Sequence, residues 1–182
     1  MEKLSDSEFL EGLGNPESRN YTFNLLVRQY QERLYWTIRR IVLSHEDADD
    51  LLQETFVKVW EKIDSFKGQS RLSTWMIRIA TNKALNFLKE KRRIFWIPLI
   101  DVEKNLEQIL ESDPYFDGDE AEKQFQKAIL KLPEKQRVVF QMRYYEELKF
   151  TEIAEIMGLS EGGVKANYHQ AQKKVKDFLS PD

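Results

Sequence analysis

Apolar residues recur every three or four positions along most of the chain, which is the spacing of one face of an α-helix. This periodicity predicts helices over residues 5–13, 21–42, 44–63, 71–93 and 132–148, and a shorter one over 102–111. The alternation typical of β-strands is nearly absent, and glycine and proline number only seven and five. The sequence therefore predicts an all-α protein.

The periodic pattern is interrupted between residues 94 and 122, which contain Pro98, Pro114 and nine acidic residues against a single lysine. Such a composition is typical of a linker. We therefore expect two small helical domains, over residues 1–93 and 123–182, joined by an acidic linker over 94–122. Taken alone, the linker is most simply a solvated tether, and the alternative is a segment that occupies a basic nucleic-acid channel.

Composition limits the chemistry available to these 182 residues. The chain has no cysteine and only two histidines, His45 and His169, so a disulfide framework is excluded and a thiolate or multi-histidine metal site is disfavoured. No cofactor site is indicated. Neither a targeting segment nor an apolar run of membrane-spanning length is present, so we expect a cytoplasmic protein without membrane insertion.

The helix expected over residues 71–93 has an unusual polar face. This segment holds seven basic residues against Glu90 alone. At 100° per residue, an apolar side around Met76 and Ala80 separates from a polar side of cations and amides that also carries Trp75. Cations suit phosphates, amides suit base edges, and an aromatic ring suits a base removed from its stack. The face is therefore either a surface for single-stranded or melting DNA, or an ordinary solvated face with Trp75 buried by another helix.

Residues 149–176 carry the spacing of a helix-turn-helix. We expect Thr151 to cap a short first helix, Gly158 to make the turn and Ser160 to cap the second helix. On that second helix Val164 and its periodic partners face the core. The outward positions, which are candidates for a DNA groove, are Gly162, Lys165, Ala166, His169, Gln170 and Lys173. Lysine suits phosphate or guanine and glutamine suits adenine.

Residues 45–54 gather several carboxylates beside His45, an arrangement that raises the question of a metal or acid-base site. The spacing lacks the glycine-centred loop of a calcium site, and the carboxylates lie on a continuing helix. The remaining interpretations are a solvated face and a surface for a protein partner.

Three stretches together resemble one family: "DADDLLQETFVKVW", "DSFKGQSRLSTWMIRIATNKALNFLKEKRR" and "LPEKQRVVFQMRYYEELKFTEIAEIMGLSEGGVKANYHQAQKKV". They resemble the ECF (extracytoplasmic function) group of bacterial RNA polymerase sigma factors, over about residues 8–179. The resemblance implies a protein that binds core RNA polymerase and recognises the minus-10 and minus-35 promoter elements. It implies no enzymatic activity of the chain itself, action on DNA in the nucleoid, and an anti-sigma factor as a further candidate partner.

The resemblance also assigns residues by position. The polymerase-binding residues would be Asp50, Gln53 and Glu54. A pocket for a flipped minus-10 base would comprise Lys58, Phe66 and Asn82, and the backbone contacts beside it would come from Arg78, Asn86, Lys89 and Arg93. Trp75 is a further minus-10 residue that either touches DNA or braces the loop of Phe66. The minus-35 residues would be Arg143, Phe150, Lys165, Ala166, His169 and Gln170, to which the helical face adds Lys173.

One departure from the family limits the transfer. Many relatives carry arginines on the last helix, whereas Ala166 and Gln170 stand here, so the minus-35 sequence cannot be carried over. The rival functions are a stand-alone helix-turn-helix regulator that binds duplex DNA without polymerase, and a metal-dependent nuclease that uses the carboxylates of residues 45–54.

Overall fold

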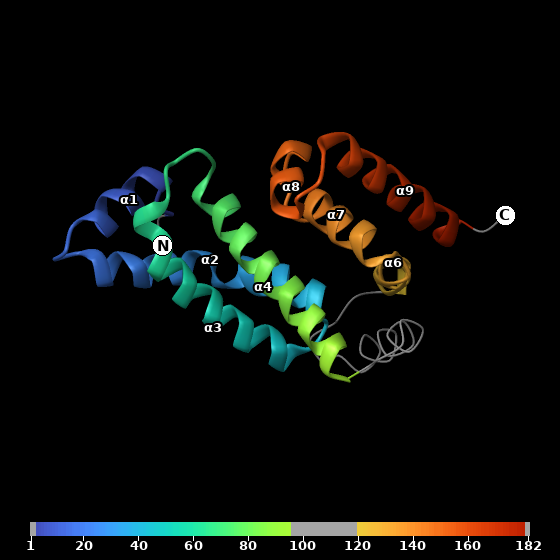
Figure 1. Cartoon of the computed structure of the whole chain (residues 1–182), viewed down its shortest axis with the longest axis horizontal. Coiled ribbons are helices and arrows are strands. Elements are labelled where there is room, and N and C mark those ends of the chain that lie inside the picture. The colour runs from blue at the N-terminus through green and yellow to red at the C-terminus, as the bar shows by residue number, and fades with distance from the viewer. Residues whose placement is uncertain (1–2, 96–119, 181–182) are drawn as a thin grey trace. The chain divides into compact units, whose positions relative to one another are not determined.

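The computed structural model describes residues 3–95 and 120–180, with the backbone alone for residues 92–95. All regular elements in these ranges are helical (Figure 1). They are α1 (Asp6–Gly14), α2 (Arg19–Val42), α3 (His45–Lys62), the short 3-10 helix η1 (Ile63–Ser65), α4 (Leu72–Phe95), α6 (Glu120–Leu130), α7 (Glu134–Tyr144), α8 (Phe150–Met157) and α9 (Glu161–Leu179). The all-α prediction is confirmed, and the helix expected over 102–111 lies outside the described residues.

The chain divides into two compact units, Met1–Phe87 and Leu88–Asp182. The division falls within α4, and α6 begins at Glu120, inside the range that the sequence assigns to the linker. The limits 1–93, 94–122 and 123–182 therefore stay a prediction for the domains. In the part of the chain that the structure describes, no helix combines the length and the apolar character that crossing a membrane requires.

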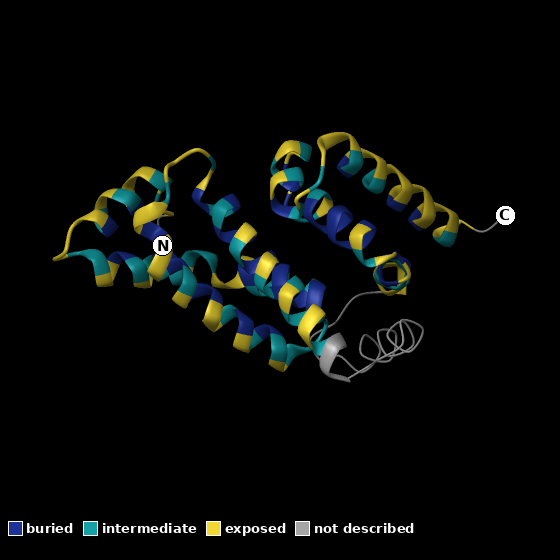
Figure 2. Cartoon of the chain, in the orientation of Figure 1, coloured by how far each residue is buried: buried dark blue, intermediate teal, exposed yellow. Residues whose placement is uncertain are grey.

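The first unit is built around α2, which packs against α1 and α3. The predicted apolar stripes supply its core, because Leu26, Leu34 and Ile38 of α2 are fully buried together with Val59 of α3. Figure 2 shows buried and exposed residues alternating along α3, as expected of a helix with one buried side. The start of α3 is also local in origin: Ser44 Oγ accepts a hydrogen bond from the backbone N–H of Asp47 at 3.2 Å and so caps the helix.

In the second unit, α9 packs against α6, α7 and α8. Its buried positions Val164, Ala171 and Val175 are those that the periodicity assigns to the core. The hydrophobic core here comprises Ala128, Ile129, Leu132, Phe140, Ala171 and Val175. The packing leaves the opposite side of α9 open to solvent, where the candidate groove residues lie.

Candidate functional site

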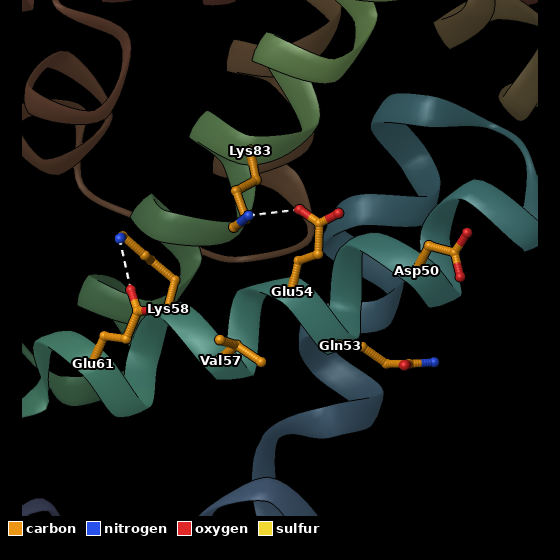
Figure 3. Close-up of a pocket in the computed structure, with 7 residues that line it drawn as sticks. All are labelled: Asp50, Gln53, Glu54, Val57, Lys58, Glu61 and Lys83. Carbon is orange, nitrogen blue, oxygen red and sulfur yellow. Dashed lines mark hydrogen bonds and ion pairs between the residues drawn. The ribbon is translucent and has the colours of Figure 1, made fainter.

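The acidic face of α3 comprises Asp50, Gln53 and Glu54, and all three side chains are exposed. Spacings of three and four residues place them on one side of the helix. They line an open depression of about 510 Å³, whose other lining residues are Val57, Lys58, Glu61 and Lys83 (Figure 3). Val57 is 59% exposed in this depression. The face therefore offers carboxylates, an amide and an apolar contact together.

Two ion pairs lie in the same depression. Lys83 of α4 donates to Glu54 Oε2 at 2.7 Å, and Lys58 donates to Glu61 Oε2 at 2.7 Å. The hydrogen bond from Lys58 lowers the pKa of Glu61. The structure thus places Lys58, which the resemblance assigns to the minus-10 pocket, beside the acidic face of α3 (Figure 3).

His45, at the start of α3, has protein partners at both ring nitrogens. Nδ1 lies 2.7 Å from the Tyr35 hydroxyl and Nε2 lies 3.3 Å from Asp49 Oδ2. Among residues 3–95 and 120–180, no three histidine or acidic side chains are grouped so that they could hold a metal ion. Nothing in this arrangement favours the nuclease alternative.

The polar face of α4 comprises Arg78, Asn82, Asn86 and Lys89, and all four side chains are exposed. On the opposite side Met76, Ala80 and Ala84 are fully buried. The helical wheel separates these two faces correctly, so the cations and amides form one continuous strip. Arg93 lies in the last turn of α4, and its side chain is outside the described residues.

Trp75 is half-buried, and its ring packs against the ring of Phe66 with 5.2 Å between the centroids. Phe66 directly follows η1, in the loop that leads to α4. Phe66 is itself half-buried, so the pair presents some ring surface to solvent. The contact is the one expected of a tryptophan that braces the loop of Phe66.

The same loop is anchored at both ends by residues that sequence reasoning missed. Arg19 donates two hydrogen bonds to the Asp64 carboxylate, at 2.8 and 2.9 Å. This hydrogen bonding lowers the pKa of Asp64. The backbone N–H of Leu72 donates to Asp6 Oδ2 at 2.7 Å, which fixes the start of α4. These partners are 45 and 66 residues apart in the chain, so no local pattern marks them.

The helix-turn-helix consists of α8, a turn at Gly158 and α9. Gly158 adopts a left-handed conformation (φ 63°), and Ser160 Oγ accepts from the N–H of Gly163 at 3.1 Å, as predicted. The expected cap at Thr151 is wrong. The N-cap is Lys149, two residues earlier, because the Glu152 carboxylate accepts from the N–H of Lys149 at 2.8 Å and satisfies the helix start from inside the first turn.

The outer face of α9 comprises Lys165, Ala166, His169, Gln170 and Lys173, and all of these are exposed. Lys165 pairs with Glu161 at 2.6 Å. Gln170 Oε1 accepts a hydrogen bond from Nε2 of Gln136, a buried residue of α7 that the sequence did not single out. No pattern local to α9 could have identified this partner.

Arg143 and Phe150 lie beside the start of α8 and are half-buried. The Arg143 guanidinium stands 5.1 Å from the centroid of the Phe150 ring and donates to the carbonyl oxygen of Leu148 at 2.9 Å. Lys165 of α9 is 6.0 Å from the same ring. The structure therefore brings these two residues together with the first residue of the outer face of α9.

Both helical units contain segments that match known protein families. Residues 26–94 match the family model for Sigma-70 region 2, and residues 122–175 match that for Sigma-70, region 4. The chain is 30% identical to the ECF RNA polymerase sigma-E factor of Haemophilus influenzae, over 99% of this chain and 98% of that protein. It is 29% identical to the ECF RNA polymerase sigma factor SigW of Bacillus subtilis, over 85% of this chain and 87% of that one.

A solved structure supports the fold. The sigma factor RpoE from Bartonella quintana, crystallised with the anti-sigma factor NepR, superposes with a TM-score of 0.68 at 22% identity, covering 88% of this chain and 98% of that chain. The same family is indicated by the two helical units, by the helix-turn-helix and by the similarity over nearly the full length of the chain. The chain therefore belongs to the ECF group of RNA polymerase sigma factors, which direct promoter recognition and the initiation of transcription.

Proposed function

We propose that three surfaces divide the work of this sigma factor. The acidic face of α3 binds core RNA polymerase, the polar face of α4 with the loop of Phe66 recognises the minus-10 element, and the outer face of α9 recognises the minus-35 element. The observation that carries the proposal is the exposure of all the described cations and amides that the resemblance assigns to α4, on a helix whose opposite side is buried.

Minus-10 recognition rests on the chemistry of this strip. Asn82 offers a donor and an acceptor to a base edge, and Arg78, Asn86, Lys89 and Arg93 lie along the same helix, where they contact phosphates. Phe66 supplies a ring beside which a flipped base stacks, supported from behind by Trp75 at 5.2 Å. Lys58 completes the pocket when the strand approaches, exchanging Glu61 for a phosphate.

Polymerase binding rests on the depression beside α3. Its exposed carboxylates Asp50 and Glu54 suit a basic partner surface, Gln53 adds a hydrogen-bonding amide, and Val57 adds apolar contact area. Glu54 of α3 forms an ion pair with Lys83 of α4. This surface therefore adjoins the helix proposed to read the minus-10 element.

Minus-35 recognition rests on the outer face of α9. Lys165 and Lys173 contact phosphates, while His169 and Gln170 face base edges and the small Ala166 allows close approach. Arg143 in the last turn of α7 and Phe150 at the start of α8 lie near Lys165 and extend this surface.

The remaining parts of the proposal concern partners and place of action. The chain catalyses no bond chemistry itself, because the bond-forming steps of initiation use the active site of the polymerase. It acts in the cytoplasm on nucleoid DNA. An anti-sigma factor is a proposed partner, since similar folds were solved in complex with such proteins.

The direct test is run-off transcription with purified core polymerase and a promoter recovered by selection from random DNA. Promoter-dependent transcripts that require the chain support the proposal. High-affinity duplex binding by the chain alone, without transcripts, would instead support a stand-alone regulator.

The division of labour is tested with two variants. Asn82→Ala is expected to slow open-complex formation by about fivefold or more while core polymerase binding stays within about twofold, since a lost base contact costs about 1 to 3 kcal/mol. Gln53→Ala is expected to weaken polymerase binding and leave the opening rate of the assembled complex unchanged. The matched controls are Asn24→Ala and Gln31→Ala, two exposed positions of α2. Equal loss of polymerase binding in both test variants contradicts the division.

A further inference from the structure

Gln136 and Gln170 form a hydrogen-bonded pair of amides that links α7 to the outer face of α9. Gln136 is only 9% exposed, and its Nε2 donates to Gln170 Oε1 at 2.7 Å. Gln170 is exposed. A buried amide therefore holds an exposed one from behind.

The hydrogen bond from Gln136 restricts which atoms of the Gln170 amide can contact DNA. A glutamine amide has an acceptor end at Oε1 and a donor end at Nε2, which carries two N–H groups. Because Gln136 donates to Oε1, one of the two acceptor sites of this oxygen is already occupied, whereas both N–H groups of Nε2 remain for DNA. Pairing with adenine uses both ends of the amide, whereas the major-groove edge of guanine presents two acceptors, O6 and N7.

Stability does not explain the presence of an amide at position 136. The side-chain oxygen of Gln136 is buried and has no hydrogen-bond partner among the described residues. An unpaired buried carbonyl oxygen destabilises a fold. Replacing the glutamine by an unbranched apolar side chain would remove this destabilisation. The hydrogen bond that this amide donates goes to Gln170, which we assign to the minus-35 surface.

We propose that Gln136 is a positioning residue for base readout: it holds the Gln170 amide with its N–H groups toward the major groove, so that one position of the minus-35 element favours guanine over adenine. This inference rests on the proposed role of α9 in minus-35 binding. It revises the pairing with adenine that the sequence alone suggests for Gln170.

The test uses holoenzyme assembled from the full chain and core polymerase, and a promoter pool with a randomised minus-35 element. Bound promoters are sequenced for wild type, Gln136→Met, Gln170→Ala and the double variant. Gln170→Ala identifies the position that Gln170 reads, and wild type is expected to prefer guanine to adenine there. Gln136→Met is expected to reduce that preference by about fivefold or more. The double variant is expected to match Gln170→Ala, because both changes act through one contact.

The matched control is Gln141→Met, which replaces another buried glutamine of α7 and is expected to leave this base preference unchanged. Circular dichroism of each variant verifies that the fold is kept. A preference for adenine at the position read by Gln170, or an unchanged preference in Gln136→Met, overturns the inference and leaves the proposed function standing. If Gln170→Ala changes no position, the base contact in the proposed function fails, and the inference fails with it.

Discussion

Trp75 illustrates how a single residue acquires a different role once its neighbours are known. On the helical wheel it stands among cations and amides, a position that suits direct stacking on a base. In the structure its ring lies against Phe66, which precedes α4 in the chain and belongs to the loop proposed to hold a flipped base. Its position therefore favours support of the loop over direct contact with DNA.

The supporting role predicts how two substitutions combine. Trp75→Ala is expected to slow open-complex formation by about fivefold, because an aromatic pair contributes about 1 kcal/mol. Phe66→Ala is expected to do at least as much, and the double variant is expected to be little worse than Phe66→Ala, since both act through the same loop. Stopped-flow fluorescence on a labelled promoter measures these rates.

Trp75→Phe is the control, because it keeps a ring against Phe66 and should retain most of the wild-type rate. Losses that add fully in the double variant would show that Trp75 contacts DNA independently of Phe66.

At the scale of the elements, the helix-turn-helix depends on one backbone conformation. Gly158 ends α8 in the left-handed region, and the space around its Cα is open, so that a Cβ there would meet no atom within 4 Å. A side chain at this position would therefore be disfavoured by the backbone alone and not by a clash. A substitution at Gly158 therefore measures the free-energy cost of the left-handed backbone conformation without a contribution from packing.

Gly158→Ala is expected to destabilise the pairing of α8 and α9 by about 1 to 2 kcal/mol, the cost of a left-handed conformation for a residue with a Cβ. Native-state hydrogen exchange of the α8 and α9 amides measures this change. Gly162→Ala is the matched control: it lies within α9, has equally open surroundings and lacks a positive φ. It should leave protection unchanged or raise stability by up to about 1 kcal/mol. Equal protection in both variants would contradict the role of the turn.

At the scale of the whole molecule, charge is segregated along the chain. Basic residues prevail in 71–93, and nine acids stand against one lysine in 94–122. We propose from the resemblance to this family that residues 94–122 thread a channel of the polymerase. Concentrated negative charge there resembles a nucleic acid in its electrostatics. Most of residues 94–122 lie outside the described residues.

Replacing the nine acids of residues 94–122 by their amides is therefore expected to reduce both polymerase binding and initiation, measured by fluorescence anisotropy and run-off transcription. A variant with the same nine acids in shuffled order keeps the charge and should retain most of the activity. Unchanged binding and initiation in the amide variant would end the mimicry hypothesis.

Much of this protein was predictable from its sequence, because helices, their caps and their buried faces are determined by residues a few positions apart. The stripe of α2, the two faces of α4 and the turn at Gly158 all follow from local spacing. The N-cap of α8 was misplaced by two residues, because the Glu152 carboxylate accepts from the N–H of Lys149 and Thr151 lies within the first turn of the helix.

The sequence by itself determined the fold class, the location of the candidate surfaces and, through three ordered motifs, the family. The tertiary structure decided which side chains meet: Arg19 with Asp64, Phe66 with Trp75, and Gln136 with Gln170. Pairings of this kind depend on how helices cross and which rotamers their packing allows, and the periodicity of one segment carries no information about either. In our proposal, base choice at α9 therefore depends on a contact between helices and not on the recognition helix alone.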